Sequence, residues 1–146
     1  MPGYSGTPLP KKLGIKPGFR VQLVNAPAEV EASLRASLAE CEVHNEERKN
    51  AEAIDFAMLF TKSRTELLKQ FAKVTNELAP AGMLWACWPK KSSGVVTDLS
   101  GDEVRAIGLG AGLVDVKVCA VTDIWSGLKF VRRVKDRKAI QSENPR

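Results

Sequence analysis

The stretch Ile54-Asp-Phe-Ala-Met-Leu-Phe60 followed by Ser63-Arg-Thr-Glu66 decides the fold. The first part is an almost unbroken apolar run, which is typical of a strand covered on both faces. The second part pairs a serine with a glutamate three residues later, a capping box that begins a helix. Leu67, Phe71 and Val74 then recur at helical spacing. The order strand, helix, strand is completed by Leu78-Ala-Pro-Ala-Gly-Met-Leu-Trp85, where Gly82 is expected to end a turn into a strand over 83–88.

Downstream of this stretch the alternation continues. Ser100 and Glu103 form a second capping box, so we expect a helix that ends in the glycine-rich Gly108-Leu-Gly-Ala-Gly112. That run has the spacing of a nucleotide loop, but it follows a helix and precedes a strand, which is the wrong order. Two strands over 114–121 and 128–134, joined by a turn at Ile124-Trp-Ser-Gly127, predict a closing antiparallel hairpin.

Upstream, a strand is predicted over 19–25, because Phe19, Val21 and Leu23 alternate with polar residues. A helix follows in which Val30 and Leu34 mark the apolar stripe. A short strand is expected over 41–44, and a polar loop or single turn over 45–52. We expect a proline- and glycine-rich leader over residues 1–18 that packs on the domain, one domain over residues 19–135, and a disordered tail over residues 136–146.

The predicted fold is therefore a three-layer α/β Rossmann-like domain with a mostly parallel sheet and a C-terminal antiparallel hairpin. Chain length supports a single core-bearing unit, since 146 residues fit one domain. Its predicted core comprises Val21, Leu23, Ile54, Phe56, Met58, Leu67, Phe71, Leu84, Val116 and Val118.

The amino-acid composition makes several classes of function less favourable. The formal charge is +5, and five basic residues lie in the segment 132–138. We expect a solvated strand and tail there, with nucleic-acid contact as the alternative. No aromatic residue interleaves with these charges, so a platform that stacks single-stranded bases is not supported. The three cysteines show no CxxC spacing, and His44 is the single histidine, so no metal site is predicted. No apolar run is long enough to cross a bilayer and no signal-peptide pattern is present, which predicts a cytoplasmic location.

The layout of residues 19–134 resembles that of class I methyltransferases, in a shortened form that lacks one strand–helix unit before Ile54. The junction over 78–85 is similar to their Leu-x-Pro-Gly-Gly-x-Leu turn. More narrowly, the chain resembles a small bacterial family of unknown function. The stretches that carry this resemblance are Tyr4-Ser-Gly-Thr-Pro8, Lys12-Leu-Gly-Ile15, Trp88-Pro-Lys-Lys91 and Trp125-Ser-Gly-Leu-Lys-Phe-Val-Arg132.

The methyltransferase resemblance implies S-adenosylmethionine as cofactor, held by a glycine-rich loop after the first strand. Here that position is occupied by Asn25, Ala26 and Pro27, which bring Cβ atoms and a residue without an N–H group. The acid that holds the ribose in that family would correspond to Glu46 or Glu47. We therefore expect no S-adenosylmethionine binding at micromolar concentration, and no other cofactor is predicted.

A basic rim is the main candidate site. In open α/β sheets, ligands bind outside the carboxyl ends of the strands. Lysines, an arginine and small polar residues follow the two central strands there, next to a helix start whose N–H groups favour anions. A solvated basic surface is the alternative. The candidate residues are Lys62, Ser63, Arg64, Trp88 as a stacking face, Lys90, Lys91, Ser92, Ser93 and Gly94.

Three hypotheses for function follow. The first is a non-catalytic Rossmann-like binding or interaction module, which holds a small anionic or nucleotide-like ligand at the carboxyl ends of the strands. The second is an S-adenosylmethionine-dependent methyltransferase with an atypical cofactor loop, and the third is a nucleic-acid-associated protein that uses the basic C-terminal segment. No catalytic set is visible beyond lysines and the isolated Asp98 and Asp123. The oligomeric state is left open, a homodimer included.

Overall fold

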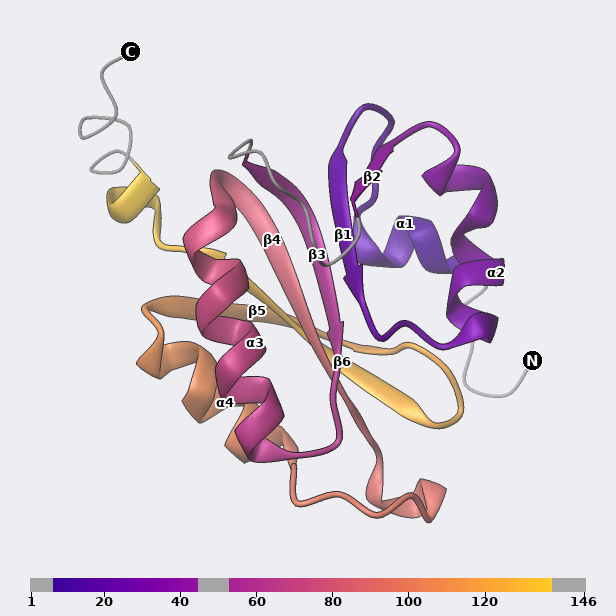
Figure 1. Cartoon of the computed structure of the whole chain (residues 1–146), viewed down its shortest axis with the longest axis vertical. Helices are drawn as coiled ribbons and strands as arrows, with labels where there is room; N and C mark the ends of the chain where they lie inside the picture. Colours follow the sequence, from indigo (N-terminus) through magenta and orange to yellow (C-terminus); the bar gives the residue numbers. More distant parts are fainter. Residues whose placement is uncertain (1–6, 45–52, 138–146) are drawn as a thin grey trace.

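A computed structural model describes residues 7–44 and 53–137 (Figure 1). Helices and strands alternate through most of this range, as the sequence predicts. Residues 1–6, 45–52 and 138–146 lie outside the described ranges, and with them the predicted polar loop and the candidate acids Glu46 and Glu47. The elements are α1 (Leu9–Leu13), β1 (Arg20–Val24), α2 (Ala28–Leu38), β2 (Glu42–His44), β3 (Ile54–Phe60), α3 (Arg64–Glu77), β4 (Leu78–Pro89), the 3-10 turn η1 (Lys91–Ser93), α4 (Gly101–Gly110), β5 (Leu113–Ala120) and β6 (Trp125–Arg132).

The strands form one six-stranded sheet in the order β2-β1-β3-β4-β6-β5. The four strands β2, β1, β3 and β4 run parallel to one another. Strand β6 is antiparallel to both of its neighbours, β4 and β5. The predicted fold class is confirmed: a mostly parallel α/β sheet that closes with an antiparallel hairpin.

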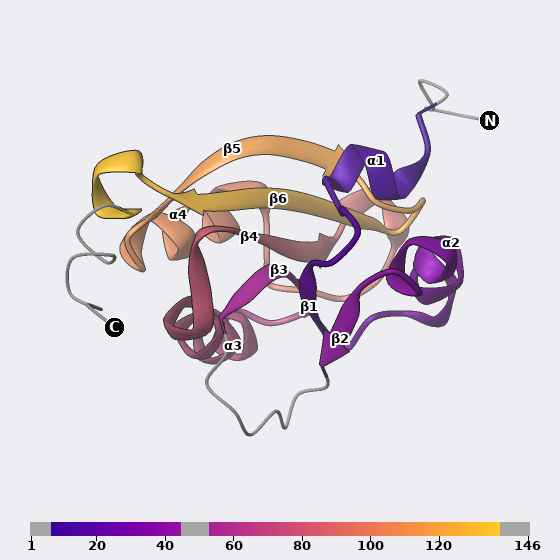
Figure 2. The ribbon, with the colours of Figure 1, turned by 90° about the horizontal axis from the view of Figure 1, so that it is seen from above.

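Helices cover both faces of the sheet and create two cores (Figure 2). On one face α3 and α4 bury Leu67, Phe71 and Val104 against the sheet, and the rings of Phe71 and Phe130 meet edge to face at 5.2 Å. On the other face α1 and α2 bury Leu13 and Leu34. Strand β3 lies between the two cores, which explains its almost unbroken apolar sequence.

Two predicted core positions are wrong. Val116 is 55% exposed and Val118 is 68% exposed, because β5 is an edge strand of the sheet. A register shift between Asp115 and Lys117 also interrupts the regular alternation of β5. Leu23 is only partly buried against the core beneath α1 and α2, and the other predicted core residues are buried.

The start of β4 differs from the prediction. The strand begins at Leu78, directly after α3, so Gly82 lies within the strand and does not end a turn. Pairing with β3 jumps from Ile54–Leu78 to Phe56–Met83, which is a bulge. A Cβ atom on Gly82 would lie 2.7 Å from the carbonyl oxygen of Ile54, so this close approach of the two backbones requires glycine.

The turn of the closing hairpin is also displaced. Trp125, Ser126 and Gly127 belong to β6, and the turn lies at Val121–Ile124 instead. Thr122 stabilises it, because its Oγ1 accepts hydrogen bonds from the N–H groups of Ile124 and Trp125, each at 3.0 Å. Gly127 lies in a tightly packed part of the strand, since a Cβ there would lie 3.1 Å from side-chain atoms of Trp85 and Val121.

The leader and the tail meet the domain through hydrogen bonds. The indole Nε1 of the buried Trp85 donates to the carbonyl oxygen of Leu13 at 3.0 Å, which fixes the end of α1 on the sheet. At the other end, residues 134–137 form a helical turn in which the N–H of Arg137 donates to the carbonyl of Arg133. This turn includes Asp136 and Arg137, the first two residues of the predicted tail, and the rest of that segment lies outside the described residues.

Candidate functional site

The carboxyl ends of β1, β3 and β4 lie at the same edge of the sheet because these strands are parallel. The strand order also reverses there. From β1 the chain passes to β2 on one side, whereas from β3 it passes to β4 on the other. In open α/β folds, ligands bind at such a reversal. The segments that end β1, β3 and β4 therefore form the candidate site.

Asn25 occupies the end of β1 in an unusual conformation. Its φ angle is 59°, in the left-handed region that asparagine tolerates better than most residues. Its Nδ2 donates to Oε2 of Glu66 at 3.1 Å, which links the end of β1 to the first turn of α3. Ala26 and Pro27 complete the loop, and Pro27 is the N-cap residue of α2 without a side-chain cap.

Thr61 directly follows β3 and is 1% exposed. Its N–H donates to the carbonyl of Cys87 on β4 at 3.2 Å. Its Oγ1 has no hydrogen-bond partner among the residues that the structure describes. A buried hydroxyl without a partner is costly, so a polar ligand atom or a water molecule at this position would be favourable.

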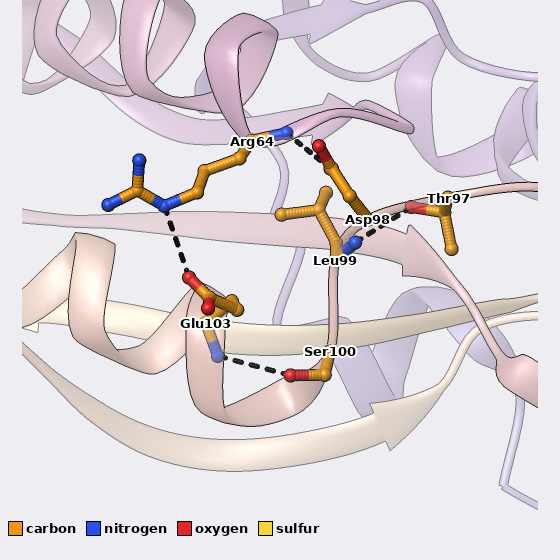
Figure 3. A network of polar contacts seen from close by, with 6 residues as sticks. All are labelled: Arg64, Thr97, Asp98, Leu99, Ser100 and Glu103. Carbon is orange, nitrogen blue, oxygen red and sulfur yellow. Dashed lines mark hydrogen bonds and ion pairs between the residues drawn. The ribbon is translucent and has the colours of Figure 1, made fainter.

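The start of α3 is already engaged by side chains (Figure 3). Ser63 caps it, with Oγ accepting from the N–H of Glu66 at 3.1 Å. Asp98 accepts a hydrogen bond from the N–H of Arg64 at 2.7 Å, and the Nε of Arg64 lies 3.1 Å from the Oε1 of Glu103. The N-terminus of α3 thus holds a carboxylate of the same chain, and the Arg64 side chain is paired.

The segment before α4 completes this network. Thr97 Oγ1 donates to the carbonyl of Lys62 at 2.6 Å and accepts from the N–H of Leu99 at 3.1 Å. Ser100 caps α4, with Oγ accepting from the N–H of Glu103 at 3.3 Å. We call Arg64, Thr97, Asp98, Ser100 and Glu103 the α3–α4 clasp, because they join the starts of the two helices (Figure 3).

The lysines of the predicted rim stand outside the clasp. Lys62 and Lys91 are exposed, and Lys90 is half-buried. Within residues 7–44 and 53–137, none of the three forms an ion pair. Lys90 is positioned by its backbone, whose N–H donates to the carbonyl of Ile124 at 2.8 Å.

The serine loop after Lys91 is ordered by its own hydrogen bonds. Ser93 Oγ donates to the carbonyl of Lys90 at 2.6 Å and accepts from the N–H of Val95 at 3.1 Å. Ser92 is exposed, and Gly94 takes a positive φ of 82° to end the turn. The Ser92 hydroxyl is therefore free of these turn contacts, whereas that of Ser93 is used to hold the loop.

Trp88 does not offer an open stacking face. It is 9% exposed and belongs to the core beneath α3 and α4, where the start of α4 packs on its ring. Of the two isolated acids, Asp98 belongs to the clasp and Asp123 is exposed in the hairpin turn. Within the described ranges, no group of His, Cys, Asp and Glu side chains is arranged to hold a metal ion.

Burial shifts the pKa of three groups in the sheet strands β4 and β6. It raises the pKa of the Cys87 thiol well above its ordinary value, with a further rise from Cys119. It lowers the pKa of Lys129, and the neighbouring Lys117 lowers it further. It also lowers the pKa of Arg132, whose Nη2 donates to the carbonyls of Thr75 and Leu78 at the end of α3. The two backbone contacts of Arg132 indicate that it has a structural role.

Sequence reasoning missed three members of the site. Glu66 was assigned to a reciprocal capping box, but its carboxylate accepts from Asn25, 41 residues away. No sequence motif marks Thr61 or Thr97. The position of Thr61 just after a buried strand was the one local signal, because parallel strands end at the ligand edge.

The fold and this edge define a Rossmann-like α/β protein of methyltransferase-like layout. The chain belongs to the family described as "Protein of unknown function (DUF3052)", whose model matches residues 10–134. No curated protein matches the sequence. Among residues 7–44 and 53–137, no helix is both long enough and apolar enough to cross a membrane.

Several solved methyltransferase structures are similar to this fold. A putative methyltransferase from Thermoplasma acidophilum has a TM-score of 0.59 at 8% identity, over 87% of this chain and 75% of that one. A SAM-dependent methyltransferase from Aquifex aeolicus has a TM-score of 0.55 at 18% identity, over 82% and 85%. Magnesium protoporphyrin IX methyltransferase from Synechocystis, with bound SAH, has a TM-score of 0.56 at 10% identity, over 80% and 75%. At these identities the likeness establishes the fold alone.

Proposed function

We propose that this protein is a Rossmann-like binding module that holds a small anionic ligand, such as a phosphate-bearing or nucleotide-like compound, at the carboxyl ends of β1, β3 and β4. The observation that carries the proposal is the reversal of strand order between β1 and β3, with Lys62, Lys90 and Lys91 following the adjacent strands. Open α/β sheets bind their ligands at this position.

The clasp divides the rim into a neutralised part and a cationic part. Arg64 is paired with Glu103, and Asp98 already accepts the N–H at the start of α3. The anion is therefore not expected at that helix start. Lys62, Lys90 and Lys91 supply the attraction instead, as they have no ion-pair partner within the described ranges.

Two hydroxyl groups favour a ligand that has hydrogen-bonding groups as well as a negative charge. Thr61, which directly precedes Lys62, has a buried hydroxyl without a hydrogen-bond partner among the described residues. Ser92 adds an exposed hydroxyl in the loop after β4. A ligand that combines an anionic group with a hydrogen-bonding part would satisfy both kinds of residue.

The second candidate is an S-adenosylmethionine-dependent methyltransferase with an atypical loop. One observation favours it: Asn25 adopts the left-handed conformation, so the loop after β1 makes a turn of the kind that glycine commonly provides. Pro27 opposes it, because this residue offers no N–H group to the cofactor. The loop over 25–28, which offers Cβ atoms and a residue without an N–H group, favours the binding module.

A thermal-shift panel separates the candidates. It contains inorganic phosphate, nucleotides, phosphorylated sugars and S-adenosylmethionine, each against the wild type and the Lys90→Ala/Lys91→Ala variant. A ligand present at 100 times its Kd should raise the unfolding free energy by about 2.7 kcal/mol. The proposal predicts stabilisation by an anionic compound that the double variant loses. Tight binding of S-adenosylmethionine would favour the transferase, and no stabilisation by any compound would reject the ligand site.

A further inference from the structure

A second surface lies away from the carboxyl edge, along the edge strand β5. Strand β5 is last in the sheet order, so one row of its backbone N–H and C=O groups has no strand partner in the part of the chain that the structure describes. Such a row can pair with an added strand. The register shift between Asp115 and Lys117 interrupts β5, and its pairing with β6 is regular from Lys117 to Ala120. We therefore consider the backbone edge of residues 117–120.

The two faces of this half-strand differ in chemistry. Lys117 pairs with Lys129 of β6, which pairs with Trp85 of β4, so these side chains share the face that α1 and α2 cover. Val118 pairs with Leu128, which belongs to the core beneath α3 and α4, so Val118 points to the opposite face. Val118 is 68% exposed. The edge therefore presents lysine on one face and a bare apolar side chain on the other.

Beside β5, the charge on the lysine face is mainly positive. The elements α1, β4, β5 and β6 contain the lysines Lys11, Lys12, Lys117 and Lys129 and one acid, Asp115. Helix α2, which covers the same face, adds Glu29, Glu31 and Arg35. The carboxylate of Asp115 lies 3.2 Å from the Nε of Arg105 on α4, on the other face of the sheet. Lys117 reaches over α1, where its Nζ donates to the carbonyl of Lys12 at 2.8 Å.

We propose that β5 accepts an extended, acidic, amphipathic segment of a partner protein, which adds to the sheet as a further strand. A segment that alternates acidic and apolar residues places its carboxylates beside Lys117 and its apolar side chains beside Val118, because side chains alternate between the faces of a strand. The inference concerns a different surface from the proposed ligand site and does not depend on it.

Charge and shape favour this occupant over two others. A nucleic acid has no strand backbone to pair with β5, and no aromatic side chain is among the exposed large hydrophobic residues of the described chain to stack on bases. A second copy of this chain would bring the same lysine-bearing edge against itself, and like charges across paired strands are destabilising. An acidic segment satisfies both the lysine face and the unpaired backbone.

The test is an NMR titration of the 15N-labelled protein with two short synthetic peptides at low salt. One peptide alternates glutamate with valine, and the other alternates lysine with valine. The proposal predicts that the glutamate peptide binds, with the largest amide shifts in β5 and β6. It also predicts that Lys117→Glu weakens this binding by roughly tenfold and creates binding to the lysine peptide. Lys69→Glu, an equal change of charge at an exposed position of α3 outside both proposed sites, should leave both results unchanged.

Several outcomes would overturn the proposal. One is a glutamate peptide that does not bind, or that binds the Lys117→Glu variant and the wild type equally. If Lys117→Glu does not fold, Lys117→Gln takes its place, because it removes the charge without reversing it. Another is a DNA duplex that shifts the β5 amides while the peptide does not, which would assign the surface to nucleic acid. A third is a dimer of the protein alone, detected by sedimentation, that Lys117→Glu strengthens or dissolves, because a second copy would then occupy β5.

Discussion

Asn25 combines a strained backbone with a contact across the candidate site. Its φ of 59° suits glycine or asparagine, and its side chain bonds to Glu66. Asn25→Ala should lower the free energy of unfolding by about 1–2 kcal/mol, because alanine in the left-handed region is strained. Asn25→Gly, which removes the same hydrogen bond without the strain, should cost less. Urea denaturation measures both, and equal losses would show that the backbone conformation carries no strain.

Two glycines at the end of α4 make a matched pair. A Cβ atom on Gly108 would overlap the Phe130 ring, whereas no described atom lies within 4 Å of one on Gly110. Gly108→Ala should therefore cost about 1–3 kcal/mol through overpacking. Gly110→Ala should stabilise the protein by about 0.4–1 kcal/mol, since it restricts the unfolded chain. Thermal unfolding of the two variants compares them, and similar melting temperatures would contradict the packing of α4 on β6.

At the scale of elements, the α3–α4 clasp joins two helices through Asp98. Its carboxylate accepts from the first N–H of α3, which acts as a cap supplied from another segment. Asp98→Ala should cost about 0.5–2 kcal/mol, the usual range for loss of a helix cap. Glu103→Gln, which weakens only the exposed pair with Arg64, should cost about 0–1 kcal/mol. Chemical denaturation decides, and a larger loss for Glu103→Gln would contradict the assigned roles.

The sequence predicted elements where the signals are local. The apolar run of β3 and the serine caps of α3 and α4 depend on neighbouring residues, and these elements are present. The sequence-based predictions were wrong where a local structure depends on a contact with a residue distant in the sequence. Gly82 resembled a turn residue, but it is required by the carbonyl of Ile54 on the adjacent strand.

The candidate site shows the same division. The positions of Lys62 and Lys90 after two central strands could be predicted, because they depend only on where the strands end. The pairing of Arg64 with Glu103 joins residues 39 apart, and no sequence pattern indicated it. Trp88 was assigned to the rim because it precedes the loop, but strand alternation directs it into the core beneath α3 and α4.

At the scale of the whole molecule, burial of Cys87 links stability to pH. Burial raises the pKa of its thiol in the folded state above the unfolded value, which is about 8.5. Its contribution to stability is complete below that unfolded value. It is lost as pH rises toward the folded value, because the unfolded chain releases its proton first. The decline in unfolding free energy above about pH 8.5 should therefore be shallower in Cys87→Ala, as urea titrations at several pH values would show. Identical slopes would contradict the assigned burial.

The central claim is that the carboxyl edge of the sheet holds a small anionic ligand. The most direct measurement is an NMR titration of the 15N-labelled protein with the anionic compound that gives the largest thermal shift. We predict that the largest amide shifts fall at Thr61, Lys62 and residues 90–94, and that Lys90→Ala/Lys91→Ala abolishes them while the protein stays folded. Exposed charges contribute little to folding, so the variant should unfold at nearly the same temperature. Shifts that lie elsewhere, or that persist in the double variant, would contradict the claim.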